Sequence, residues 1–167
     1  MKSRSFLVAV LCSLSAISFS TFALSPPKGK VILTVAGHVS ERNTANSATF
    51  DMEMLEKLPQ QNFSTMTPWD KKPIKFKGPL LRDVLAAAKA TGTTIKAAAL
   101  NDYQTSIPME DAQKFDVIVA HEMNGEKIPV KTKGPLFIVY PFDSKEELRA
   151  TVYYERSAWQ LKSMTIE

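Results

Sequence analysis

The chain has little of what nucleophilic and metal chemistry needs: its 167 residues include one cysteine and two histidines. The cysteine, Cys12, lies in an N-terminal apolar segment, so residues 24–167 contain no thiolate nucleophile, thiolate metal ligand or disulfide. His38 and His121 are far apart and lack the paired spacing of a zinc motif. The glycine motifs of nucleotide-binding proteins and the G-x-S-x-G elbow are absent as well. These absences disfavour zinc-dependent, nucleotide-binding and serine or cysteine hydrolase classes.

The basic excess is also smaller than it first looks. Lys2 and Arg4 precede an apolar run that ends in small residues at Ala23, which is the plan of a secretory signal peptide over residues 1–23. Serines interrupt the run, which argues against a membrane anchor of about 20 apolar residues. Without this segment the formal charge falls from +4 to +2, and nucleic acid is no longer an expected partner. We therefore expect a periplasmic protein, exported by a Sec-type signal, with no transmembrane anchor after cleavage.

The remaining sequence predicts a short flexible leader over residues 24–29, because Pro26-Pro27 blocks regular structure, and one domain over residues 30–167. Asn124-Gly125 is a strong hairpin signal. Helices are expected after an Asp51 cap, at 79–91, at 108–114 and after a Ser144/Glu147 capping box. Strands are expected at 31–36, 74–78, 95–100, 103–107, 117–120, 136–140 and 159–166. Many short strands with few helices indicate an α+β fold.

Six segments, taken in order, resemble the catalytic domain of the sulfite oxidase family, the oxidoreductase molybdopterin-binding domain. Together they extend from about Val31 to Ile166, and their order and spacing are more specific than any one of them. The resemblance implies a mixed β-sheet fold with few short helices, and a molybdopterin cofactor in the family's enzymes. The segments are Thr34–Val39, Phe76–Leu85, Asn101–Tyr103 with Ser106–Pro108, Val119–Pro129, Gly134–Leu136 and Trp159–Ile166.

The chain departs from the family pattern where the cofactor would be held. The resembling enzymes bind molybdenum through a cysteine in the segment before the Phe76–Leu85 stretch, and the matching residues here, 63–69, contain no thiol. Hydroxyl groups are poor substitutes for a soft thiolate ligand. Two family cations, an arginine and a lysine, are replaced by Phe137 and Ala158. The N-terminus also lacks the twin arginine with which such enzymes are exported folded. We therefore expect no resident cofactor, with molybdopterin as the alternative.

These observations lead to three hypotheses, and whether the protein is an enzyme stays open. The first is a periplasmic binding or sensory accessory module without molybdenum catalysis, whose partner is a small ligand or a periplasmic or membrane sensor protein. The second is a molybdopterin-dependent oxidoreductase with non-thiolate metal ligation, with Tyr103 and His121 as proton donors. The third is a structural partner of a membrane sensor or enzyme, favoured if side chains such as Phe137 fill the crevice. The candidate ligand-binding crevice is lined by His38, Thr65, Thr67, Trp69, Asn101, Asp102, Tyr103 and His121.

Overall fold

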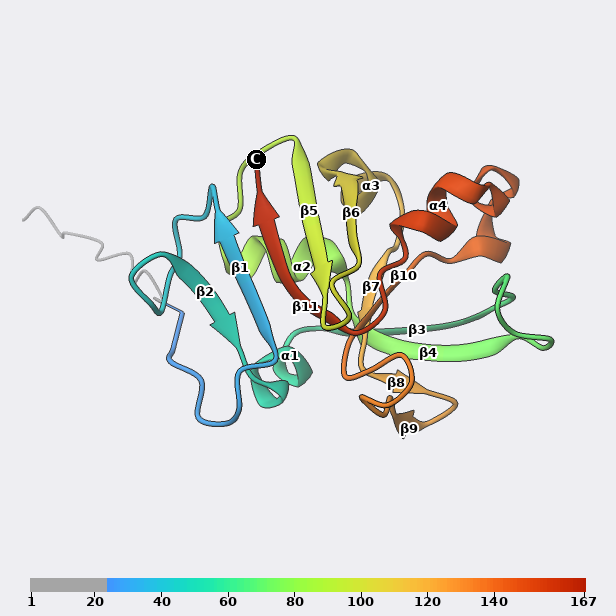
Figure 1. Ribbon diagram of the computed structural model, residues 1–167, viewed down its shortest axis with the longest axis horizontal. Coiled ribbons are helices and arrows are strands. Elements are labelled where there is room, and N and C mark those ends of the chain that lie inside the picture. Colours follow the sequence, from blue (N-terminus) through green and yellow to red (C-terminus); the bar gives the residue numbers. More distant parts are fainter. Residues whose placement is uncertain (1–23) are drawn as a thin grey trace, which may run out of the picture.

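Strands dominate the computed structural model, which describes residues 24–167; the proposed signal peptide, residues 1–23, lies outside the described residues. The strands form sheets of five, four and two strands, and the α-helices are four and short, so the α+β prediction is confirmed (Figure 1). In chain order the elements are β1 (Leu33–Gly37), β2 (Ser47–Phe50), α1 (Met52–Lys57), β3 (Gln60–Thr65), β4 (Ile74–Pro79), α2 (Leu81–Ala87), β5 (Thr94–Ala99), β6 (Gln104–Pro108), α3 (Met109–Lys114), β7 (Ile118–Ala120), β8 (Glu122–Met123), β9 (Glu126–Lys127), β10 (Phe137–Val139), α4 (Thr151–Arg156) and β11 (Leu161–Ile166).

The five-stranded sheet has the order β2-β1-β11-β5-β6 and places the last strand of the chain at its centre. β11 pairs in parallel with β1 and antiparallel with β5, so the sheet is mixed. Helix α2 lies behind this sheet (Figure 1) and buries Leu81, Val84 and Leu85 completely or nearly so. This apolar stripe recurs at three- and four-residue spacing, which is the pattern of a helix packed on one face.

The remaining sheets form the other part of the molecule. β3 and β4 make a long antiparallel hairpin, and β8 extends that sheet beside β4. Asn124 and Gly125 join β8 to β9 with φ values of 52° and 86°, which confirms the hairpin prediction at this dipeptide. β7 and β10 pair with each other and are buried along their whole length, so they form the centre of the hydrophobic core.

Two local predictions need correction, and three elements were not predicted. The helix expected at 79–91 is only Leu81–Ala87, because the chain turns at Lys89 with a φ of 44°. The Ser144/Glu147 capping box is wrong: Lys145 is extended and separates two 3₁₀ helices, Phe142–Ser144 and Glu146–Arg149, that have no side-chain cap. Strands β2 and β3 and helix α4 were not expected. β2 and β3 lie in polar stretches, and α4 buries none of its residues, so none of the three carries a periodic apolar signal.

No helix within residues 24–167 has the length and apolar character needed to cross a membrane.

Candidate functional site

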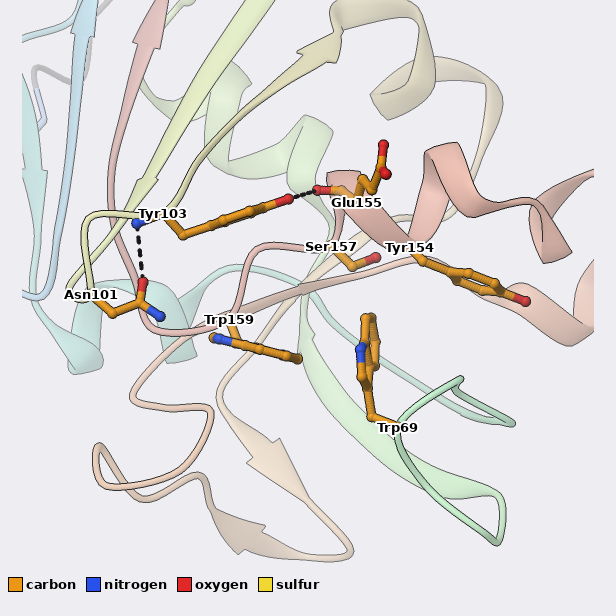
Figure 2. Close-up of a pocket in the computed structure, with 7 residues that line it drawn as sticks. All are labelled: Trp69, Asn101, Tyr103, Tyr154, Glu155, Ser157 and Trp159. Carbon is orange, nitrogen blue, oxygen red and sulfur yellow. Dashed lines mark hydrogen bonds between the residues drawn. The ribbon is translucent and has the colours of Figure 1, made fainter.

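A pocket of about 260 Å³ opens at the end of the five-stranded sheet where β11 begins (Figure 2). Trp69 reaches it from the loop after β3, the β5–β6 turn contributes two residues, and the end of α4 contributes three. Aromatic rings make up most of its wall, as is usual in ligand sites. The lining residues are Trp69, Asn101, Tyr103, Tyr154, Glu155, Ser157 and Trp159.

The β5–β6 turn forms one side of the pocket and is held in a defined shape. Asp102 adopts a φ of 64°, and its N–H donates to the Ala99 carbonyl at 3.2 Å, as in a three-residue hairpin loop. The Asn101 side chain accepts a hydrogen bond from the Tyr103 N–H at 3.2 Å. The Tyr103 hydroxyl then donates to the carbonyl oxygen of Glu155 at 2.6 Å (Figure 2). This last bond ties the turn to the end of α4 across the pocket.

An aromatic cluster of Trp69, Phe137 and Trp159 forms the opposite side. The two indoles meet edge to face with ring centroids 5.2 Å apart, and Phe137 lies 6.0 and 6.2 Å from them. The Lys133 ammonium lies 5.6 to 5.9 Å from all three rings, within the range of cation–π attraction. Trp69 and Trp159 are therefore held by apolar packing and by one cation.

Asp70 fixes the position of that cation. Its carboxylate accepts hydrogen bonds from the Lys133 ammonium at 2.9 Å and from the Thr67 hydroxyl at 2.7 Å. Partial burial alone would raise the pKa of Asp70, but the bonds from Thr67 and Lys133 together outweigh burial and lower it. Asp70 is therefore ionised at neutral pH, and it keeps Lys133 against the aromatic cluster.

A polar triad of the buried Asp111 and Tyr140 and the partly buried Arg156 anchors α4. One carboxylate oxygen of Asp111 accepts from the Tyr140 hydroxyl at 2.7 Å and from the Arg156 guanidinium at 2.9 Å. Burial and the hydrogen bond to Asp111 raise the pKa of Tyr140 far above its usual value, so its hydroxyl remains a donor. Since Arg156 follows Tyr154 and Glu155 directly, this triad sets where the α4 side of the pocket lies.

Of the eight predicted crevice residues, the structure brings Trp69, Asn101 and Tyr103 together in the pocket. Asp102 is their neighbour in the turn but points to solvent, where its carboxylate pairs with Lys162 at 3.3 Å. Thr65 and Thr67 are buried, and their hydroxyls serve the fold. The Thr65 hydroxyl accepts from the Asp143 N–H at 3.0 Å, while that of Thr67 is bound to Asp70.

The two histidines lie outside the pocket. His38 is exposed after β1, where its backbone N–H donates to the carbonyl of Ile166. Ile166 ends β11 and the pocket lies where β11 begins, so His38 is at the opposite end of the sheet from the pocket. His121 is buried, with Nε2 2.8 Å from the Gln60 amide oxygen. Burial lowers the pKa of His121, so it is neutral at pH 7. No cluster of three or more metal-ligating side chains occurs within residues 24–167.

Sequence reasoning did not identify four pocket residues, Tyr154, Glu155, Ser157 and Trp159. Three of them lie on or just after α4, the helix whose sequence has no apolar stripe. Trp159 was expected only as the first residue of the last strand. The density of aromatic residues in Tyr153, Tyr154 and Trp159 is the one signal that points to this segment.

The sequence model of the family described as oxidoreductase molybdopterin binding domain matches residues 31–143. The crystal structure of the sulfane dehydrogenase SoxCD from Paracoccus pantotrophus matches with a TM-score of 0.61 and 17% sequence identity. That match covers 80% of this chain but only 37% of the other chain, so it supports the fold alone. A comparison with curated proteins finds no match.

The residues present do not fit a molybdopterin held in the way that the family resemblance implies. Within residues 24–167 there is no thiol, and the buried hydroxyls of Thr65 and Thr67 are already engaged in internal hydrogen bonds. Phe137 and Ala158 replace the two expected cations, and both side chains are 0% exposed in the core. The Phe137 ring packs against Trp69 and Trp159 and offers no charge to an anionic group.

Proposed function

The chain belongs to the oxidoreductase molybdopterin binding domain family, and on that premise we propose that it is a binding module which has kept the scaffold without molybdenum catalysis. The observation that carries this proposal is the aromatic cluster. One of its rings, Phe137, is at the position where the family resemblance implies a cofactor-holding arginine, and the cluster leaves an open pocket on its outer side. A site that has exchanged its anchoring groups for packed rings is suited to binding rather than to redox chemistry.

The pocket is suited to a single flat, largely apolar group. Its volume of about 260 Å³ lies below the range of roughly 300–1,000 Å³ that is common for small-molecule sites. Figure 2 shows the Tyr103 ring and the Trp159 indole on opposite sides of the pocket, with Trp69 standing across one end. Aromatic walls of this kind favour stacked or edge-on contacts with a ring. The Asn101 amide and the Ser157 hydroxyl supply polar contacts at its margin.

We place this module in the periplasm as part of the same proposal. The support is the basic start and apolar run of residues 1–23, together with the lack of cysteine after residue 12. The partner in that compartment is a small ligand, or a sensor protein that presents a ring-sized side chain.

The cofactor part of the proposal is tested on protein purified from the periplasm of its native host. Molybdenum is measured by mass spectrometry, and pterin by the fluorescence of its oxidised form. We expect both to be far below one equivalent. Stoichiometric molybdenum and pterin would overturn the proposal and favour an oxidoreductase with non-thiolate ligation.

The binding part is tested by NMR, for which the chain is well suited. It contains two tryptophans, and both line the pocket, so the two indole N–H signals report on this site alone. Titration with p-cresol is expected to shift both signals saturably. Trp69→Ala should weaken binding at least fivefold, whereas Val31→Ala, an exposed apolar residue outside the pocket, should not. Absence of saturable shifts in the native protein would refute the pocket as a ligand site.

A further inference from the structure

A second hollow adjoins the pocket and runs along the edge of the five-stranded sheet. It measures about 520 Å³ and shares Tyr103 and Glu155 with the aromatic pocket. Its other lining residues come from the sheet itself: Lys96 on β5, and Gln104, Thr105 and Ser106 on the edge strand β6. A ring-sized pocket therefore opens into a longer polar groove, and the two are joined at Tyr103.

The groove exposes a row of unpaired backbone groups. β6 pairs with β5 in a register that puts Thr105 opposite Ala97. The hydrogen bond from the Ala99 N–H to the Tyr103 carbonyl shows which residues of β6 direct their backbone groups toward β5. In an antiparallel pair, alternate residues direct their N–H and C=O groups to the partner strand. The backbone N–H and C=O groups of Thr105 therefore point toward β5, and those of Gln104 and Ser106 point to the outer edge of the sheet. Within residues 24–167 these outward groups have no backbone partner.

Charges at the two ends of the groove differ in sign. Glu155, where the pocket meets the groove, is exposed and forms no ion pair with any described residue, in contrast to the neighbouring Arg156 and Asp102. Lys96 lies on the adjoining strand, with its ammonium 3.0 Å from the Ser106 hydroxyl and 3.9 Å from the Glu167 carboxylate. A ligand that follows the groove thus meets a carboxylate near the aromatic pocket and an ammonium farther along.

We propose that the pocket and groove together bind an extended polypeptide segment. An aromatic side chain of the segment enters the pocket, a basic residue beside it pairs with Glu155, and its backbone pairs with the outer edge of β6. Only an extended backbone offers donors and acceptors at the spacing of the free groups on Gln104 and Ser106, which is the basis of strand addition to a sheet edge. This inference rests on the proposed binding function and deepens it by naming the ligand as a peptide.

The first test uses calorimetry with the peptide acetyl-Gly-Ser-Lys-Phe-Ser-Val-Ser-Gly-amide and with two N-methylated forms. Methylation at alternate residues removes either the N–H groups that face the sheet edge or those that face solvent. We expect one form to lose affinity at least tenfold and the other to stay within about threefold of the parent. Equal tolerance of both forms would overturn edge pairing, and replacement of the Phe by Ser should abolish binding.

The second test uses a matched pair of variants at Gln104, an exposed residue with no side-chain hydrogen bond in the described structure. Gln104→Pro deletes the outward N–H without touching the ladder to β5, and proline is tolerated on edge strands. Gln104→Ala deletes the side chain and keeps the N–H. We expect at least fivefold weaker peptide binding for the first variant alone, with p-cresol titrations unchanged in both. Equal peptide affinities in the two variants would refute the inference.

The outcomes also separate this inference from the proposed function. If p-cresol binds and the peptide does not, the peptide inference fails and the binding module stands. If neither binds, the pocket is not a ligand site and both fail. Circular dichroism and the thermal midpoint confirm that Gln104→Pro is folded, and the N-methyl series gives the same answer without any change to the protein.

Discussion

The pocket has two walls that are built in opposite ways. The aromatic cluster of Trp69, Phe137 and Trp159 is held by ring packing around the Lys133 ammonium, whereas the α4 wall is held by the charged hydrogen bonds of the Asp111–Tyr140–Arg156 triad. Ring packing has broad energy minima and allows small shifts. Charge-assisted hydrogen bonds are directional, and they leave a costly unpaired group when one partner is lost.

This contrast assigns different roles to the two walls. Trp69 is 37% exposed and extends from a loop, so the aromatic wall can adapt to the group it binds. The α4 wall is fixed to the core, because Asp111 and Tyr140 are buried on α3 and after β10. A pocket with one adaptable and one fixed wall can select the size of a group while tolerating its exact outline.

The largest effect is expected at the one fully buried ring of the aromatic wall. Phe137→Ala removes a side chain that is 0% exposed and contacts Trp69, Phe76 and Trp159, so it leaves a cavity in the core. We expect the free energy of unfolding to fall by about 3–5 kcal/mol in urea titrations. Phe63→Ala is the matched control, because Phe63 is only partly buried, and it should cost much less. Equal losses would mean that Phe137 is not a central support of this wall.

Loss of the carboxylate from the α4 wall should be the next most costly change. Asp111→Asn leaves the partly buried Arg156 guanidinium without its counter-charge, and we expect a loss of about 2 kcal/mol of stability, less than for a fully buried pair. It should also weaken p-cresol binding, since α4 carries three pocket residues. Asp116→Asn breaks an exposed ion pair with Arg82 and should cost less than about 1 kcal/mol in the same titration. A change at Asp111 as small as that at Asp116 would contradict the fixed-wall description.

A smaller effect is expected when the cation is removed from the adaptable wall. Lys133→Met keeps the apolar stem and deletes the ammonium that lies over three rings. Cation–π and partly buried ion-pair contributions suggest a loss of about 1 kcal/mol. The indole N–H signals of the two tryptophans should shift without loss of the folded spectrum. Complete unfolding of this variant would show that the aromatic wall depends on charge as much as the α4 wall does.

The smallest effect is a dependence on pH that comes from Asp70. Its pKa is lowered in the folded protein, so it stabilises the fold above the ordinary aspartate pKa of about 3.9. That contribution is lost as the pH falls below this value and through the lowered pKa. Urea midpoints measured from pH 7 down to strong acid should show this loss in the native protein and a reduced loss in Asp70→Asn. Identical acid profiles of the native protein and Asp70→Asn would show that Asp70 does not contribute to the pH dependence of stability.

Much of the scaffold could be predicted from the sequence because it rests on local signals. The buried strands around Val119 and Ile138 are short apolar runs, and Asn124-Gly125 has the conformational freedom its turn requires. Asp51 caps α1 as expected, with its carboxylate accepting from the Met54 N–H at 2.9 Å. The family match agrees with the fold inferred from resemblance.

The site was harder to predict because it is made of long-range contacts. Trp69, Tyr103 and Trp159 come from three separate segments, and nothing local shows that they converge. Thr65 and Thr67 have the same polarity as ligand-binding residues, but their hydroxyls form hydrogen bonds with Asp143 and Asp70 that stabilise loops. The His121 ring is likewise hydrogen-bonded within the protein, to the Gln60 side chain. These three side chains are engaged in hydrogen bonds within the protein, and sequence alone does not reveal those bonds.

The central place of β11 has a consequence for the rate of folding. β11 is hydrogen-bonded to β1 on one side and to β5 on the other, so without residues 161–166 the five-stranded sheet falls into two separate pairs, β2-β1 and β5-β6. These pairs come from distant parts of the sequence, and only the last strand joins them. Formation of the sheet is therefore a long-range event, because it needs contacts between segments that are far apart in the sequence, and such contacts favour slow folding.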